Sequence, residues 1–194
     1  MKKIFLAATM FLLVGFGCTQ NENGKIVSPN PGGEAETTRD NSLSVPQQPM
    51  KLTSSAFGDG GKLPSKYSCD GEEINPPLQI SDVPVDAKSL AFIMDDPDTP
   101  DGIFTHWIMW NLNSQLKEIQ ENSVPAGATE GTTSIETSGY VGACPPSGMH
   151  RYMFKLFALD TTLDLSETTT SEQLQKAMEG HVLEQAVLMA TYTR

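Results

Sequence analysis

The stretch Ser-Leu-Ala-Phe-Ile-Met-Asp-Asp-Pro-Asp-Thr-Pro, residues 89–100, decides the fold of this chain. Its first half is an almost continuous apolar run, and its second half is an acidic turn that Pro97 and Pro100 stiffen. A short apolar run that ends in turn-forming residues is typical of a buried β-strand. We therefore expect a strand over residues 89–94 that leads into a rigid, acidic loop.

Two further stretches alternate with the period of two that a strand requires. In residues 105–112, strict alternation places these residues on one face: His106, Ile108, Trp110 and Leu112. In residues 152–160, it groups Tyr152, Phe154, Leu156 and Ala158. Extending the second pattern backwards adds His150 to the face of Tyr152. These patterns, together with the many proline and glycine residues that interrupt the chain elsewhere, predict a mostly β domain.

One helix is indicated near the C-terminus. Thr169 and Glu172 have the spacing of a capping box, a helical stripe follows over residues 174–178, and Gly180 can end the helix. We also expect a second short helix over residues 181–186, followed by a last strand near residues 188–192.

The N-terminal residues have the composition of a targeting segment. Lys2 and Lys3 precede an apolar run over residues 4–16, which is shorter than the ~18 residues that span a bilayer but suits a secretion signal. Cys18 follows a small residue, as in the lipobox of bacterial lipoproteins. We expect residues 1–17 to be a signal peptide and Cys18 to be lipidated, which would anchor the chain in a bacterial cell envelope; plain secretion is the alternative.

Residues 18–48 are polar, rich in Asn, Ser, Thr, Pro and Gly, and show no periodicity. This composition is typical of a flexible tether. The remaining residues, 49–194, have the size of one domain with a single core.

The chain is acidic, with 24 Asp and Glu against 13 Lys and Arg and a formal net charge of −11. This charge disfavours nucleic acid and anionic membrane surfaces as general partners. Any anion that binds must do so through local donors, against the overall field.

Cys69 and Cys144 remain as an even pair if Cys18 is lipidated. In an exported chain a disulfide between them is the natural interpretation. Free thiols beside a ligand site are the alternative. The spacing does not measure their separation, so both stay open.

The loops over residues 95–106 and 142–152 contain two of the three histidines, His106 and His150. Imidazoles, a tyrosine hydroxyl and loop N–H groups are suitable donors to a phosphate or carboxylate, and an aspartate can orient an imidazole. We therefore expect one small-anion pocket between the loops, with Trp107 or Phe104 as an apolar rim.

Other chemistries fit these loops less well. A calcium loop over residues 96–102 would lack its fifth-position oxygen ligand and has glycine one place late. A metal site of two histidines and Asp96 has no short-range pair of ligands to support it. For nucleophilic catalysis, Ser147 does not lie in a G-x-S-x-G turn, and Cys144 has a possible structural partner. A buried His–Asp pair with complete hydrogen bonds and no functional role would account for one of these histidines, but less well for two that each adjoin a rigid loop.

Two long strings within these loops are specific. One is Asp96-Pro97-Asp98-x-Pro100 followed by His106-Trp107, and the other is Gly142-x-x-Pro145-Pro146-x-Gly148-x-His150-Arg151-Tyr152. Together they resemble the two signature motifs of the phosphatidylethanolamine-binding protein family, and most closely those of its bacterial, Raf-kinase-inhibitor-like branch. Further similarity extends over nearly the whole of residues 51–194.

The resemblance implies a Greek-key β-sheet or sandwich domain with a few peripheral helices near the C-terminus. It implies that the pocket is formed by Asp96, His106, Pro146, His150 and Tyr152, with Asp98, Pro100 and Gly142 in its walls. Arg151 is expected to pair with an acidic loop residue. Eukaryotic relatives carry a longer aromatic insertion where this chain has Phe104 and Thr105, so kinase regulation is not carried over.

We expect an exported, membrane-tethered binding protein without a cofactor, which accepts phosphate or a phospholipid head-group in this pocket. The main alternative is a hydrolase or lyase that uses His106 and His150 as acid and base, with Asp96 as the orienting group. A third class is an interaction or inhibitor module whose protein partner inserts an acidic or phosphorylated side chain.

Overall fold

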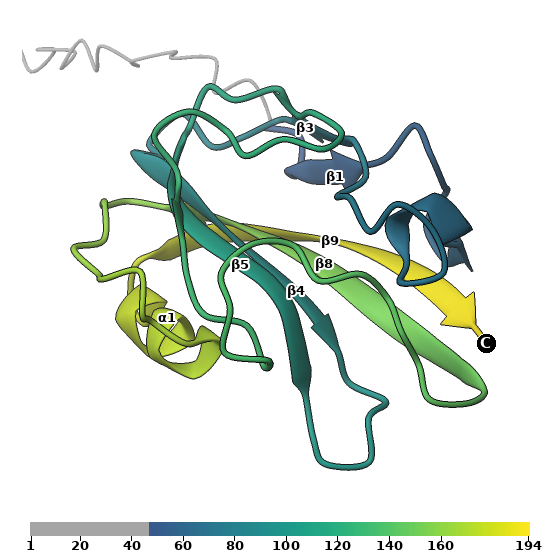
Figure 1. Cartoon of the computed structure of the whole chain (residues 1–194). Coiled ribbons are helices and arrows are strands. Elements are labelled where there is room, and N and C mark those ends of the chain that lie inside the picture. Colours follow the sequence, from purple (N-terminus) through teal and green to yellow (C-terminus); the bar gives the residue numbers. More distant parts are fainter. Residues whose placement is uncertain (1–46) are drawn as a thin grey trace, which may run out of the picture. The chain divides into compact units, whose positions relative to one another are not determined.

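The computed structural model describes residues 47–194 (Figure 1). The expected signal peptide, the expected lipidation at Cys18 and nearly all of the expected tether lie outside the described residues. Within residues 47–194, no helix is both long enough and apolar enough to cross a membrane.

The domain is mainly β, as the sequence predicts. Its elements, in chain order, are β1 Lys51–Thr53, β2 Gly61–Lys62, a 3-10 turn Ser65–Tyr67, β3 Leu78–Ser81, β4 Ser89–Asp96, β5 Phe104–Asn113, β6 Glu118–Ile119, β7 Thr129–Glu130, β8 Met149–Leu159, α1 Ser171–Met178 and β9 Val182–Thr193. Instead of a few peripheral helices near the C-terminus, the described residues contain one α-helix there.

The strands form two open sheets. The larger has the order β2-β9-β8-β4-β5-β7, and the smaller has the order β1-β3-β6. The small sheet covers one face of the large one, and α1 lies against the other face (Figure 1). The four long strands are antiparallel neighbours: β4 pairs with β5, β8 pairs with β9, and the two pairs are joined through β4 and β8.

The strand β4 is buried along its whole length because both of its faces are covered. Leu90, Phe92 and Met94 pack into the core beneath the small sheet, whereas Ala91 and Ile93 pack into the core beneath α1. Two-sided burial explains why its sequence is a continuous apolar run rather than an alternating one. The predicted strand is therefore confirmed, and it extends two residues further, to Asp96.

The predicted helix over residues 181–186 is wrong, because these residues belong to β9 except for His181. The strand pairs with β8 over its full length, from Met149 opposite Thr193 to Leu159 opposite Val182. Every second side chain from Ala186 to Tyr192 is buried, which is the pattern of a strand. Long-range pairing overrides the local helix preference of residues such as Glu184 and Gln185.

The predicted helix before Gly180 is confirmed, but its cap lies one residue later than expected. Thr170, not Thr169, is the N-cap: its hydroxyl accepts from the N–H of Gln173, whose side chain accepts from the N–H of Thr170. This is a complete capping box with glutamine in the usual glutamate position. The buried stripe packs α1 onto the sheet through Leu174 and Met178.

Two extra residues in β5 break the alternation that the sequence suggests. The register with β4 shifts between the pairs Leu90–Leu112 and Phe92–Met109, and again between Met94–Trp107 and Asp95–Thr105. In both intervals β5 has one residue more than β4. A β-bulge of this kind reverses the face on which the following side chains lie.

The bulges move two residues to the opposite face from the one predicted. Ile108 and Trp110 face the core under α1, but Leu112 packs under the small sheet. His106 is the extra residue of the second bulge, and its ring contacts Tyr152, which also lies on the small-sheet side. The prediction that His106 and Leu112 share a face with Ile108 and Trp110 is therefore wrong.

Asn111 stabilises the first bulge, and its replacement should be costly. Its backbone has a φ of 57°, and its amide both donates to Leu163 O at 2.8 Å and accepts from Leu163 N at 2.9 Å. We expect Asn111→Ala to lower the free energy of unfolding by about 2–4 kcal/mol, through two lost hydrogen bonds and strain at positive φ. Asn111→Gly, which loses the same bonds without the strain, should lose about 1 kcal/mol less in urea unfolding. Equal stability of Asn111→Ala and the unsubstituted protein would contradict this account.

Candidate functional site

A recess of about 330 Å³ lies where the acidic end of β4, the start of β5 and the start of β8 meet the loop over residues 141–146. Its volume is in the range of small-ligand sites. The lining residues are Asp96, Thr99, Pro100, Phe104, His106, Ile135, Val141, Gly142, Cys144, Pro145, Pro146 and Tyr152. Most of this wall is apolar, so the few polar groups determine what the recess can bind.

His106 is held by two hydrogen bonds to a single residue of the facing loop. The N–H of Val141 donates to His106 O at 3.0 Å, and the ring Nδ1 of His106 donates to Val141 O at 2.9 Å. The ring also packs against Phe104, with centroids 4.6 Å apart, and edge-on against Tyr152 at 5.2 Å. Burial lowers the pKa of His106, so its imidazole is neutral at pH 7.

Asp96 forms a buried pair with His150. Nδ1 of His150 lies 2.7 Å from Oδ2 of Asp96, and the side chains are only 8% and 3% exposed. The other carboxylate oxygen accepts from the N–H of Asp98 at 2.8 Å. Both oxygens of Asp96 are therefore engaged by protein donors, and the orientation of this carboxylate is fixed.

The hydroxyl of Tyr152 lies in the wall of the recess near the carboxylate of Asp96 and the backbone N–H of Cys144, but it makes no hydrogen bond of normal geometry within the described part of the chain. The residue is fully buried. Burial and the charge of the neighbouring Asp96 raise the pKa of Tyr152, so the hydroxyl keeps its proton. A buried hydroxyl without a partner is unfavourable unless a ligand or water completes it.

Asp98 turns away from the recess to bind Arg151, as the sequence predicts for this arginine. The guanidinium donates from Nε to Oδ2 at 2.9 Å and from the terminal Nη2 to Oδ1 at 2.6 Å, and the backbone N–H of Arg151 adds a third bond. This bidentate pair lowers the pKa of Asp98 to about 2. It attaches the loop after β4 to the start of β8.

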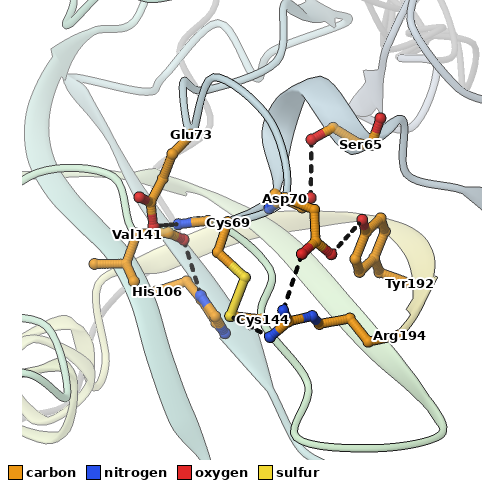
Figure 2. The surroundings of a disulfide bond; sticks show 11 residues. Ser65, Cys69, Asp70, Glu73, His106, Val141, Cys144, Tyr192 and Arg194 are labelled. Atoms are coloured by element: carbon orange, nitrogen blue, oxygen red, sulfur yellow. Dashed lines mark hydrogen bonds and ion pairs between the residues drawn. A yellow bond between two sulfur atoms is a disulfide. The ribbon is translucent and has the colours of Figure 1, made fainter.

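A disulfide joins Cys69 to Cys144, with Cα atoms 5.4 Å apart (Figure 2). It links the wall of the recess to the segment after the 3-10 turn. The backbone of this segment adds a hydrogen bond from Cys69 N to Ala143 O at 3.1 Å. On the same side, Asp70 accepts from Tyr192 and pairs with Arg194 (Figure 2).

Gly142 permits the close approach of these two segments. A Cβ atom at this position would lie 2.9 Å from the backbone carbon of Ser68 and 3.0 Å from the nitrogen of Cys69. Its N–H donates to Glu73 at 3.3 Å. A larger residue would push the loop over residues 141–146 away from the Cys69 segment.

The structure brings most of the predicted site residues to this recess. Six of the eight line it: Asp96, Pro100, His106, Gly142, Pro146 and Tyr152. The other two lie in contact with lining elements, His150 through Asp96 and Asp98 through Arg151. Both histidines therefore contribute to this site: His106 lines the recess, and His150 contacts the lining residue Asp96.

The suggestion of Trp107 as a rim residue is wrong, whereas Phe104 does line the recess. Trp107 is 1% exposed and lies in the core, where its indole N–H donates to Glu130 at 2.7 Å. The sequence reasoning missed Val141 and the half-exposed Ile135. No local pattern identifies either residue, because both enter the site through pairing of residues 134–141 with β5.

Comparison with known proteins agrees with this geometry. The profile described as "Phosphatidylethanolamine-binding protein" matches residues 53–193. The chain belongs to the phosphatidylethanolamine-binding protein family. Among its relatives, a UPF0098 protein of Methanothermobacter thermautotrophicus is 48% identical over 150 residues, covering 75% of this chain and 99% of the relative. A UPF0098 protein of Chlamydia muridarum is 47% identical over 148 residues, covering 74% and 98%.

Solved structures of this family have a similar fold. The crystal structure of a phosphatidylethanolamine-binding protein homolog, CT736 of Chlamydia trachomatis, matches with a TM-score of 0.73 at 44% identity, over 75% of this chain and 98% of that one. E. coli YbcL, described as a new member of the mammalian family, matches with a TM-score of 0.72 at 25% identity, over 76% and 99%. The family predicted from the two loop strings is thus confirmed.

Reduction of the disulfide should destabilise the domain. The bond closes a loop with a sequence separation of 75, for which chain entropy gives about 4 kcal/mol. We expect urea unfolding with a thiol reductant to show a loss of this order. In a Cys69→Ala, Cys144→Ala double variant the reductant should have no further effect; an equal response of both proteins would contradict the assignment.

The carboxyl group of Asp98 should titrate well below its usual range. Since its pKa is lowered to about 2 in the folded protein, the stabilisation from the pair is complete above about pH 4 and disappears as the pH falls towards 2. Carboxyl-detected NMR should show this titration directly. In Arg151→Gln the pKa should return towards about 4, whereas Arg194→Gln should leave it unchanged. A normal pKa in the unsubstituted protein would refute the bidentate pair.

Proposed function

We propose that this protein binds a small anion, a phosphate group or the phosphate of a phospholipid head-group, in the recess without changing it chemically. The observation that carries the proposal is the fully buried Tyr152 hydroxyl, which lies at the wall of a ligand-sized recess and makes no hydrogen bond of normal geometry within residues 47–194. A ligand oxygen that accepts from this hydroxyl would remove the cost of leaving it unpaired.

The fixed carboxylate of Asp96 and its partner His150 support a preorganised site. Because both carboxylate oxygens already accept from protein donors, Asp96 does not need to move when a ligand enters. The Asp98–Arg151 pair and the disulfide hold two of the surrounding segments. A site whose walls are fixed before binding loses little conformational entropy on binding.

The apolar part of the wall suits a ligand with a carbon-containing arm. Phe104, Ile135, Pro145 and Pro146 line the recess, and Ile135 is 53% exposed at the same time. A head-group or a phosphorylated side chain has a methylene arm next to its phosphate, which could pack against these residues. The name of the family, which refers to phosphatidylethanolamine, supports the head-group as a candidate.

We further propose that the domain acts at the surface of a bacterial envelope, held there by a lipid on Cys18 and a tether over residues 18–48. The composition of these residues supports this arrangement. A tethered domain would meet head-groups of its own membrane at high effective concentration. A protein partner that inserts a phosphorylated or acidic side chain, and is thereby inhibited, is a further candidate.

An enzyme is the second candidate, because the His150–Asp96 pair has the geometry of a base with an orienting carboxylate. The possible nucleophiles do not support covalent catalysis: Cys144 is in the disulfide, and Ser147 is not among the lining residues. Hydrolysis of a panel of esters and phosphoesters, lost in His106→Ala and His150→Ala, would favour the enzyme over the binding protein.

Removing the Tyr152 hydroxyl should weaken anion binding. We expect Tyr152→Phe to bind phosphate and phosphoethanolamine about tenfold more weakly than the unsubstituted protein in calorimetry, which corresponds to one hydrogen bond. The matched control is Tyr67→Phe, whose hydroxyl instead donates to Glu121 at 2.6 Å. His150→Ala should also weaken binding by releasing Asp96. Identical affinities of the unsubstituted protein and both site variants would refute the anion site.

A further inference from the structure

The recess offers an anion few hydrogen-bond donors. Among residues 47–194, no lysine or arginine lines it. The N–H groups of Val141 and Gly142 already donate to other protein groups, the two prolines of the same loop have none, and the hydroxyl of Thr99 donates to Gly102. The N–H of Cys144 lies next to the Tyr152 hydroxyl. Both of these donors are neutral, and the hydroxyl lies beside the carboxylate of Asp96.

The ring of His106 presents an acceptor rather than a donor. Because a carbonyl oxygen only accepts, the bond to Val141 O requires the ring proton to be on Nδ1. In the neutral ring, Nε2 then carries a lone pair. The backbone of Gly142 also lies near this ring, where it favours the protonated form. Burial lowers the pKa of this imidazole and keeps it neutral at pH 7. An anion entering the recess would therefore meet a lone pair.

The ionisable groups around this ring come from two strands. β4 contributes Asp96, and β8 contributes His150 and Tyr152. The loop over residues 141–146 contributes none, since its cysteine is in the disulfide. The negative charge of Asp96 opposes a second anion in the recess and favours a positive charge on the imidazole.

One cation lies close to the disulfide but is already paired. The guanidinium of Arg194 is 3.4 Å from Sγ of Cys144 and 3.1 Å from the carboxylate of Asp70. Figure 2 shows it on the side of Asp70 and Tyr192. Arg194 is not among the lining residues, so it does not supply the missing donor.

We infer that the recess takes up its anion together with one proton from the solvent, which binds Nε2 of His106 and is donated to an oxygen of the anion. This inference rests on the proposed function. The proton adds to the lone pair of the ring, no bond of the ligand is broken, and the proton returns to the solvent when the anion leaves. An anion that carries its own proton, such as dihydrogen phosphate, can supply the same hydrogen bond.

Coupling of this kind sets the sign of the pH dependence. The imidazole has a pKa below its usual value in the free protein, and a neighbouring anion raises it. Between these two pKa values the affinity falls as the pH rises, by up to about tenfold for each pH unit. The site would therefore be occupied preferentially under mildly acidic conditions, or by singly protonated phosphate monoesters.

Sulfate is the sharpest probe, because it remains a dianion between about pH 5 and pH 8 and cannot supply the proton itself. Calorimetric titration of the full-length protein with sodium sulfate, at several pH values and in two buffers of different ionisation enthalpy, measures both the affinity and the protons taken up. We expect uptake of about one proton at pH 7, and an affinity at pH 8 that is about tenfold or more below that at pH 6.

NMR titration identifies the group that takes up the proton. The chain has three histidines, so their ring signals can be assigned with single substitutions. Sulfate should raise the pKa of His106 above its usual value of about 6.5, whereas exposed His181, paired with Asp160 at 2.8 Å, should not respond. The His106→Gln variant has a neutral amide donor and should lose the proton uptake, while His181→Gln should match the unsubstituted protein.

The possible failures are distinguishable. Sulfate binding without proton uptake, or with uptake that changes the titration of His150 alone, would overturn this inference and leave anion binding intact. No binding of sulfate, phosphate or phosphoethanolamine at any pH would overturn the proposed function and this inference with it. If His106→Gln does not fold, the NMR titration of the unsubstituted protein still gives the answer.

Discussion

The paired hydrogen bonds between His106 and Val141 are the constraint on which the rest of the site depends. They join His106, the extra residue in the second bulge of β5, to the loop over residues 141–146. The same two bonds determine which ring nitrogen carries the proton and where the loop stands. Phe104, Tyr152 and the disulfide then complete the wall around a ring whose position is already set.

Much of the fold follows from the sequence because its patterns report burial. Two-sided burial makes β4 a continuous apolar run, and one-sided alternation in β8 correctly places Tyr152 and Phe154 on the same face. The C-terminal strand was the exception: residues 182–186 have no helix-breaking signal of their own, and only their pairing with β8 makes them extended. Long-range pairing of that kind leaves little trace in a local pattern.

The site was predictable in its residue types but not in its geometry. The two loop strings identify the family and the residues around the recess, yet strict alternation would have turned His106 towards the core under α1. Whether a strand contains a bulge depends on its neighbour's register, which the sequence of β5 alone does not determine. The same holds for the division of roles between the histidines, since one lines the recess and the other acts through Asp96.

The covalent link between Cys69 and Cys144 has a consequence for biogenesis. The disulfide joins the loop over residues 141–146 to the segment around Cys69, which is synthesised earlier. Formation of this bond requires an oxidant. A nascent chain can pair its long strands before this step, but the wall is not yet cross-linked. Competence to hold a ligand would then be acquired late, in whichever compartment supplies thiol oxidation, and a chain retained among reduced thiols would carry a looser site.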